Sequence, residues 1–176
     1  MNLFDKLKLN PSIPPFLSKK GIFVVDDTIG ISLLIASSFQ QNKNEKYLII
    51  TSNLYKAQEI YNLLCSFLNE QEILLFPADE LVRAETIAQS KEMVAQRLYV
   101  MNQIISNKAK IIISNVSAVT RYLPSLDLFK KYTIQLKVGQ TYDMQEIKNK
   151  LIKAGYLLVN KVDSSLQFAV RGDILD

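Results

Sequence analysis

Four short apolar runs, separated by helical patterns, constrain the fold of this 176-residue chain more than any other feature. Each run is rich in Ile, Val, Leu and Phe, which is typical of strands buried on both faces of a parallel sheet. The runs are Gly21–Val25, Tyr47–Thr51, Ile73–Phe76 and Lys110–Ser114. Their alternation with helices predicts an α/β fold with an open parallel sheet and helices on both faces. In such sheets the functional site lies beyond the carboxyl ends of the strands.

Apolar residues spaced three and four apart predict three helices between these runs. The residues expected to share an apolar face are Ile31, Leu34, Ile35 and Phe39 in the first helix, Leu54, Ala57, Tyr61, Leu64, Cys65 and Leu68 in the second, and Met93, Leu98, Met101, Ile104 and Ile105 in the third. Ser90 is predicted to be the N-cap of the third helix. We expect each helix to pack against the sheet through this apolar face.

The composition excludes several functional classes. The chain has no histidine and a single cysteine, Cys65, so a zinc site and Cys–His catalysis are ruled out. One cysteine also allows no internal disulfide and fits a reducing compartment. No apolar run approaches the ~18 residues of a membrane span. With 48% hydrophobic residues, the chain can bury a sizeable core.

A segment that resembles a degenerate phosphate-binding loop follows the first apolar run. A Walker A loop reads G-x-x-x-x-G-K-[ST], and its backbone N–H groups and lysine hold the phosphates. In Val25–Ser32, Gly30 and Ser32 stand in register with that motif. Val25 replaces the first glycine, and Ile31 replaces the lysine. The loop therefore lacks the residues that its chemistry needs.

Two carboxylates in the same segment also oppose phosphate binding. Asp26 and Asp27 stand beside the space that a triphosphate would occupy, and like charges repel. The sequence predicts a nucleotide-binding fold that binds no nucleotide. The alternative, that Gly30 and Ser32 match the motif by chance, stays open.

The organisation changes near Phe129. Tyr132–Lys137 alternates like a strand, and Asp143 with Glu146 predicts a capping box at the start of a helix that Gly155 ends. Two further strands are predicted at Tyr156–Val162 and about Gln167–Arg171, joined by the turn Asp163-Ser164-Ser165. We therefore expect one domain at residues 1–129 and the first part of a small α+β lobe at residues 130–176. Residues 1–129 hold 13 basic and 12 acidic side chains, against 8 and 5 in residues 130–176, so the lobe carries the basic surface.

Seven segments follow one another in an order that resembles a known family. They are IITSNLYKAQEIYNLL (49–64), LLFPADEL (74–81), SKEMVAQRL (90–98), IIISNVSAVTRYLP (111–124), LKVGQ (136–140), LIKAGY (151–156) and FAVRGDILD (168–176). In order and spacing they resemble the N-terminal module of bacterial transcription-repair coupling factors, which is similar to the excinuclease protein UvrB. UvrB itself keeps a working Walker A loop, so it fits less well, although Asp173 after Arg171-Gly172 is closer to UvrB.

This resemblance implies a degenerate RecA-like domain, P-loop NTPase-like in fold, followed by the start of the lobe that contacts the excinuclease protein UvrA. The parent protein would be an ATP-dependent DNA translocase that acts on RNA polymerase stalled at lesions. Its ATP and Mg²⁺, and its contacts with RNA polymerase and double-stranded DNA, would lie outside these 176 residues. For the fragment itself the resemblance implies a non-catalytic scaffold with no cofactor, metal or membrane contact, in the bacterial cytoplasm and associated with the nucleoid.

Arg171 is the residue that the resemblance assigns to the contact with UvrA. A guanidinium presents five donors in a planar fork that suits carboxylates across an interface. A strand arginine in a local ion pair is the alternative. Phe168 has the opposite strand parity and is expected in the core, whereas Lys161 is either part of the basic patch or a solvated lysine.

Other functional classes remain as alternatives. Asp26-Asp27 resembles the acidic pair of a response-regulator receiver domain, with Asp79 as the acceptor, Ser114 as the hydroxyl and Lys137 as the phosphate sensor. The spacing to Asp79 is too long for that class. An active P-loop NTPase is a further alternative, but this chain lacks the lysine that such an enzyme needs, because Ile31 stands at that position. The acidic residues Asp79, Glu80 and Glu85 are expected to form a solvated turn.

Overall fold

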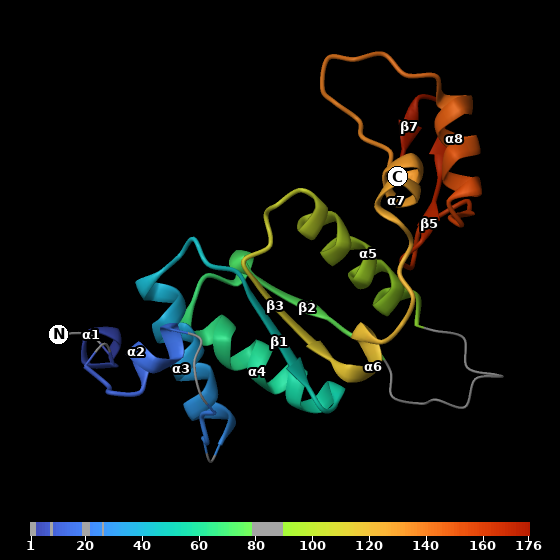
Figure 1. Cartoon of the computed structure of the whole chain (residues 1–176). Coiled ribbons are helices and arrows are strands. Elements are labelled where there is room, and N and C mark those ends of the chain that lie inside the picture. The colour runs from blue at the N-terminus through green and yellow to red at the C-terminus, as the bar shows by residue number, and fades with distance from the viewer. Residues whose placement is uncertain (1–2, 8, 19–21, 26, 79–89) are drawn as a thin grey trace. The chain divides into compact units, whose positions relative to one another are not determined.

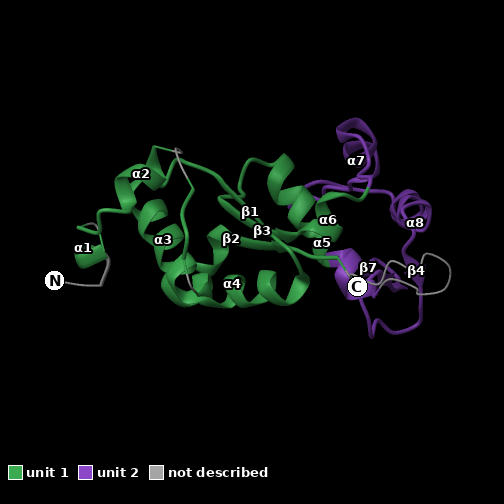
Figure 2. Ribbon diagram, turned by 60° about the horizontal axis from the view of Figure 1, so that its bottom comes forward, with its two compact units in different colours: residues 1–87, 96–121 green, residues 88–95, 122–176 purple. Residues whose placement is uncertain are grey.

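The computed structural model describes residues 3–7, 9–18, 22–25, 27–78 and 90–176 of the chain (Figure 1). The chain forms two compact units (Figure 2). The first comprises residues 1–87 and 96–121, and the second residues 88–95 and 122–176. The division into domains at residues 1–129 and 130–176 stays a prediction.

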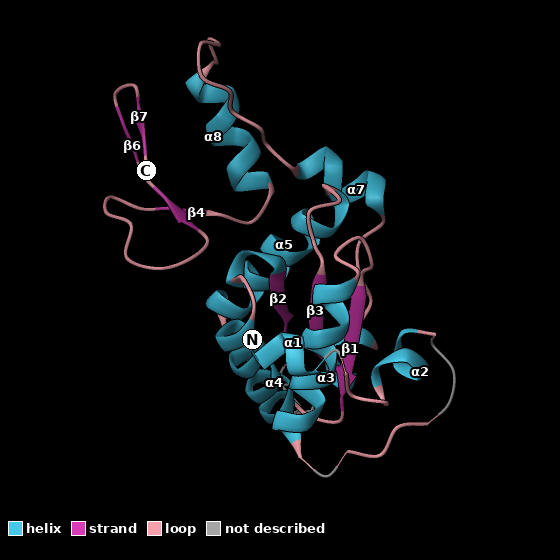
Figure 3. Cartoon of the chain, turned by 90° about the vertical axis from the view of Figure 1, so that its left-hand side faces the viewer, coloured by secondary structure: helices cyan, strands magenta, loops and turns pink. Residues whose placement is uncertain are grey.

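A parallel three-stranded sheet forms the centre of the first unit (Figures 1 and 3). Its strands are β1 (Tyr47–Thr51), β2 (Ile73–Phe76) and β3 (Ile111–Asn115), in the order β1-β3-β2. Both pairings are parallel. The predicted α/β class and three of the four predicted strands are therefore confirmed.

The fourth predicted strand is wrong. Of that segment, residues 22–25 are described, and none of them lies in a strand. Ile22 and Val24 are 94% and 89% exposed. Phe23 instead packs edge-to-face against Phe16, with ring centroids 5.5 Å apart. An apolar run becomes a strand only where a neighbouring strand accepts its peptide groups, and within the described residues this segment has no such neighbour.

Helices α3 (Thr28–Gln41) and α4 (Leu54–Phe67) cover one face of the sheet. Side chains alternate along each strand, so that Ile73, Leu75, Ile111 and Ile113 all face these helices. With them, the helix residues Ile35, Ala36, Phe39, Ala57, Ile60 and Leu64 form the main core cluster. The first two predicted helices are confirmed.

The opposite face is covered over β2 and β3. Val100 of α5 (Lys91–Ile105) packs there, together with Leu74, Phe76, Ala78, Ala109 and Ala118. On β1 the side chains on this face remain exposed, Leu48 by 61% and Ile50 by 51%. The third predicted helix exists, and its one buried residue is Val100, which the predicted face did not include. The other elements of this unit within the described residues are short: α1 (Leu3–Leu7), α2 (Ile13–Leu17), the 3₁₀ helix η1 (Glu70–Glu72) and α6 (Val116–Val119).

The second unit is a small α+β lobe. Its helices are α7 (Leu126–Tyr132) and α8 (Met144–Lys153), and its strands, of two residues each, are β4 (Leu157–Leu158), β5 (Gln167–Phe168), β6 (Val170–Arg171) and β7 (Ile174–Leu175). β4 pairs with β5 in parallel and β6 with β7 antiparallel. The predicted strands at 156–162 and 167–171 are therefore shorter than expected, and the pair does not form a hairpin.

The strand predicted at Tyr132–Lys137 is also wrong. Ser125 caps α7 by accepting a hydrogen bond from the Leu128 N–H at 3.3 Å, and the helix runs through Tyr132. Residues 133–137 belong to no helix or strand. Among the helices in the described ranges, none combines the length and the hydrophobicity that crossing a membrane requires.

Candidate partner-binding site

Arg171 lies at the end of a tight hairpin in the lobe. Ala169 and Asp176 exchange two backbone hydrogen bonds of 3.2 and 3.0 Å, and β6 and β7 pair directly beyond them. Gly172 turns the chain with a φ of +61°, in a region that glycine adopts at little cost. The backbone that carries the guanidinium is therefore part of a paired hairpin, directly before its turn.

The guanidinium of Arg171 makes only long contacts within the lobe. Its side chain is 62% exposed, and one terminal nitrogen lies 3.8 Å from a carboxylate oxygen of Asp176. The same nitrogen donates to the backbone oxygen of Asn160 at 3.5 Å. Exposed pairs of this length contribute about 0–1 kcal/mol, so most of the donor capacity of Arg171 remains available to a partner.

The residues that directly precede β6 are anchored in the core of the lobe. Phe168 and Ala169 are 2% and 1% exposed, which confirms the prediction that Phe168 is a core residue. Lys161, the neighbour of Asn160, is exposed. Since the core holds the strand, the direction of Arg171 is set by the pleat of the sheet.

Helix α8 begins and ends with local hydrogen-bonded motifs. Asp143 accepts hydrogen bonds from the N–H groups of Gln145 at 2.8 Å and Glu146 at 3.4 Å. At the other end, Gly155 has a φ of +92°, and it donates to Ile152 while Tyr156 donates to Leu151, which is the Schellman pattern. The predicted cap and stop are confirmed. The expected return bond from Glu146 is replaced by its ion pair with Lys150, at 2.6 Å.

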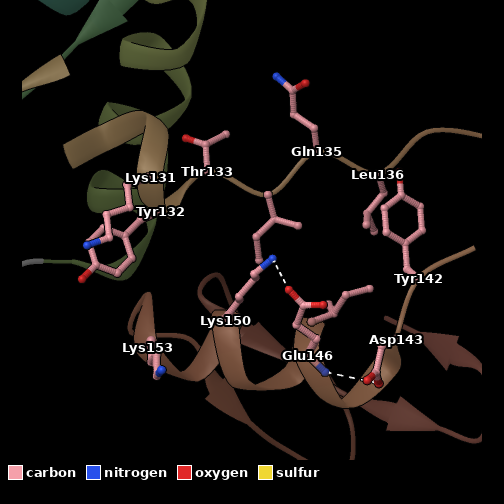
Figure 4. Close-up of a pocket in the computed structure, with 12 residues that line it drawn as sticks. Lys131, Tyr132, Thr133, Gln135, Leu136, Tyr142, Asp143, Glu146, Lys150 and Lys153 are labelled. Carbon is pink, nitrogen blue, oxygen red and sulfur yellow. Dashed lines mark hydrogen bonds and ion pairs between the residues drawn. The ribbon is translucent and has the colours of Figure 1, made fainter. Parts of the chain in front are cut away.

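A groove of about 440 Å³ lies between α8 and the segment that precedes it (Figure 4). One wall is residues 131–136 and the other is the buried side of α8 around Ile147. Lys131 and Lys153 lie towards one end, Leu136 and Tyr142 lie at the other, and Lys150 reaches between them to Glu146. Sequence reasoning missed this groove. Its only sequence signals are the excess of lysine after residue 129 and the helical spacing of Lys150 and Lys153.

The segment that resembles a phosphate loop forms a helix N-cap. Asp27 is the N-cap of α3, and its carboxylate accepts a hydrogen bond from the Gly30 N–H at 2.6 Å. A Cβ added to Gly30 would lie 2.7 Å from Val25 Cγ1, so the close approach of Val25 explains this glycine. Asp26 lies outside the described residues.

The other two positions of that motif face the protein interior. Ile31, which stands where a lysine would be needed, packs against the main core cluster. Ser32 is fully buried, and its hydroxyl donates to the Thr28 backbone oxygen at 2.8 Å. Within the described residues, neither side chain offers a group to a phosphate or to Mg²⁺.

Polar residues at the carboxyl end of the sheet are engaged in structural bonds. Asn115 is buried and bonds both the N–H and the oxygen of Ala78, at 3.1 and 2.8 Å. The hydroxyl of Ser114 donates to the Phe76 oxygen at 2.8 Å. Of the receiver residues, Lys137 belongs to the other unit, and Asp79 lies outside the described residues, as do Glu80 and Glu85.

Arg97, on α5, is partly buried. Its guanidinium lies 4.2 Å from the centroid of the Phe76 ring and donates to the Pro77 oxygen at 2.9 Å. Burial, together with the nearby charge of Arg121, lowers the pKa of Arg97. Among the described residues, no group of three or more His, Cys, Asp or Glu side chains is placed to hold a metal ion.

Comparisons with known proteins agree with the sequence motifs. Residues 134–176 match the UvrB interaction domain family. The transcription-repair-coupling factor of Bacillus subtilis (strain 168) is 32% identical over 143 residues. Those of Staphylococcus aureus strains bovine RF122 / ET3-1 and USA300 are 27% and 26% identical over the same length. The resemblance to transcription-repair-coupling factors is confirmed.

The similarity covers 81% of this chain but only 12% of the length of each of these coupling factors. The match to the UvrB interaction domain includes Arg171, the whole of α8 and the part of the groove wall from Ile134 onwards. The lobe therefore matches a second family, that of the UvrB interaction domain, in addition to the coupling factors.

Proposed function

We propose that this chain is a non-catalytic interaction module of a transcription-repair coupling factor, and that its lobe binds the excinuclease protein UvrA. The exposed guanidinium of Arg171 carries this proposal, because it is held on paired strands next to the buried Phe168 and Ala169, and its contacts within the lobe are a 3.8 Å ion pair and a 3.5 Å hydrogen bond. Docking would bring this donor fork to a carboxylate of UvrA and so recruit nucleotide-excision repair to stalled RNA polymerase.

We further propose that the first unit is a degenerate RecA-like domain with no nucleotide, cofactor or catalytic activity. The carboxylate of Asp27 already caps the helix N-terminus where a phosphate would bind, and Ile31 packs into the core. In the whole coupling factor, the ATP-driven translocase and the contacts with RNA polymerase and DNA would belong to other parts of the protein.

The test of the partner is the binding of purified UvrA to the chain and to Arg171→Ala. If the carboxylate that meets Arg171 becomes desolvated, truncation will weaken binding by about 2–5 kcal/mol. A rim contact would lose less than about 1 kcal/mol and change mainly the salt dependence. Lys148→Ala, which removes a cation elsewhere in the lobe, is the matched control, and thermal melting checks the folding of both variants.

Two outcomes contradict the proposal. If a folded Arg171→Ala variant binds as tightly as the parent chain, Arg171 is only a surface residue. If the parent chain shows no binding, the assignment of the partner fails.

The nucleotide proposal is tested separately by calorimetry. Titration of Mg²⁺–ATP into the chain should give no saturable heat at millimolar nucleotide, because the residues at the start of α3 supply no cation. Binding in the micromolar range would show that the first unit is a working nucleotide site.

A further inference from the structure

The groove between α8 and residues 131–136 has an open backbone along one wall. Neither the N–H nor the carbonyl of Ile134, Gln135 or Leu136 takes part in a hydrogen bond within the described residues. Thr133 and Gln135 point to the opposite side of the segment from Leu136 (Figure 4), the alternation of a strand. A row of unpaired peptide groups with alternating side chains is a template for an added strand.

The charge of the groove favours an acidic occupant. Its lining contains two carboxylates, and both are engaged: Asp143 caps α8, and Glu146 pairs with Lys150 at 2.6 Å. Lys131 and Lys153 have no carboxylate partner among the described residues, and Lys131 Nζ makes a distant cation–π contact, 5.9 Å from the centroid of the Tyr132 ring. Two lysine charges therefore remain to be neutralised at one end of the groove.

The rest of the lining is suited to a peptide. Ile147 is 7% exposed, while Leu136 and Tyr142 are 51% and 39% exposed, so the groove offers apolar contacts beside its unpaired peptide groups. Nucleic acid is disfavoured because its phosphate backbone needs neither apolar contacts nor unpaired peptide groups. In addition, the 8 basic and 5 acidic side chains of residues 130–176 give too small an excess of positive charge.

We propose that this groove binds an extended, acidic segment of UvrA, which adds as a strand along Ile134–Leu136 and places its carboxylates against Lys131 and Lys153. The inference rests on the proposed function, because it takes the same partner. It adds a second part to the interface, and it defines the chemistry that the partner must present there.

The test compares two double charge reversals with equal change in net charge. Lys131→Glu with Lys153→Glu alters the groove, whereas Lys130→Glu with Lys148→Glu alters two lysines of the same lobe that do not line it. Because charge reversal acts on both the rate of encounter and the bound pair, the groove variant should bind UvrA at least about tenfold more weakly than the control variant. Thermal melting verifies that both fold.

Hydrogen exchange supplies a second, independent readout. Upon binding of UvrA, exchange at the amides of Ile134, Gln135 and Leu136 should slow by at least about tenfold, since an added strand gives them acceptors. If the groove and control variants bind equally, or if these amides exchange at an unchanged rate in the complex, the groove proposal is overturned while the role of Arg171 stands. If the parent chain does not bind UvrA, both proposals fail. If the chain instead binds a DNA duplex through Lys131 and Lys153, the peptide assignment is wrong.

Discussion

The two units of this chain differ in the interactions that stabilise each of them internally. In the described part of the first unit, one face of the sheet carries a core cluster of ten buried residues and the other face a cluster of six. Among the described residues of the lobe, the buried hydrophobic side chains are Ile147, Phe168 and Ala169. The lobe relies instead on local motifs, namely the cap at Asp143, the Schellman turn at Gly155 and the hairpin at Gly172. A small core leaves much of the lobe surface available for a partner. In the first unit, by contrast, the polar side chains of Ser114 and Asn115 are used in hydrogen bonds within the fold.

The largest expected effect is in the main core. Phe39 is fully buried and lies edge-to-face against Tyr47, with ring centroids 6.0 Å apart. Phe39→Ala should destabilise the first unit by about 3–5 kcal/mol through lost burial and the cavity left behind. Denaturant unfolding with amide-resolved exchange is the measurement. If lobe amides lose the same protection as those of the first unit, the two units unfold together and the contrast drawn above is wrong.

A buried polar residue provides the next test. Asn115→Ala removes both hydrogen bonds to Ala78 and leaves buried peptide groups without partners. We expect a loss of about 1–3 kcal/mol in the free energy of unfolding. Asn53→Ala, at the N-cap of α4, is the control for loss of a single exposed hydrogen bond, the one from the Lys56 N–H. If Asn115→Ala leaves the free energy of unfolding unchanged, the carboxyl end of the sheet is less tightly ordered than the first unit as a whole.

The same chemical change can be made in both units. Asp27→Ala and Asp143→Ala each remove a helix N-cap, and each should destabilise its helix by about 1 kcal/mol. With few buried side chains to compensate, the lobe should show the larger fall in exchange protection across α8. Equal or smaller loss across α8 than across α3 would indicate that the lobe has more tertiary support than its burial suggests.

The smallest effect is confined to alkaline pH. Burial, together with the hydrogen bond to Cys65, raises the pKa of Tyr61 from 10.0 to about 12. Since the folded state holds the phenolic proton more tightly, stability is unaffected below pH 10 and falls as the pH rises from about 10 to about 12. In Tyr61→Phe the Tm should fall less steeply over that interval. Identical slopes would show that the phenol titrates alike in the folded and unfolded chains.

Several features were predictable because their causes are local. The start of α8 at Asp143 and its end before Gly155 follow from capping geometry, which involves residues only a few positions apart. The three strands of the sheet were also found, since each apolar run is flanked by a long helical pattern. The predicted strand at Tyr132–Lys137 failed for two reasons: the helix that Ser125 caps includes Tyr132, and the rest of the segment pairs with no strand among the described residues.

The sequence by itself determined the α/β class, the helices α3 and α4, the limits of α8 and the resemblance to coupling factors, since periodicity and capping depend on near neighbours in the chain. Only the tertiary structure decided which apolar runs pair. Ile22–Val25 and Ile73–Phe76 have similar composition, but only the second lies beside β3. The exposure of Arg171 and the groove beside α8 were decided in the same way. Both depend on how separate segments of the lobe pack against one another, which periodicity and capping do not encode.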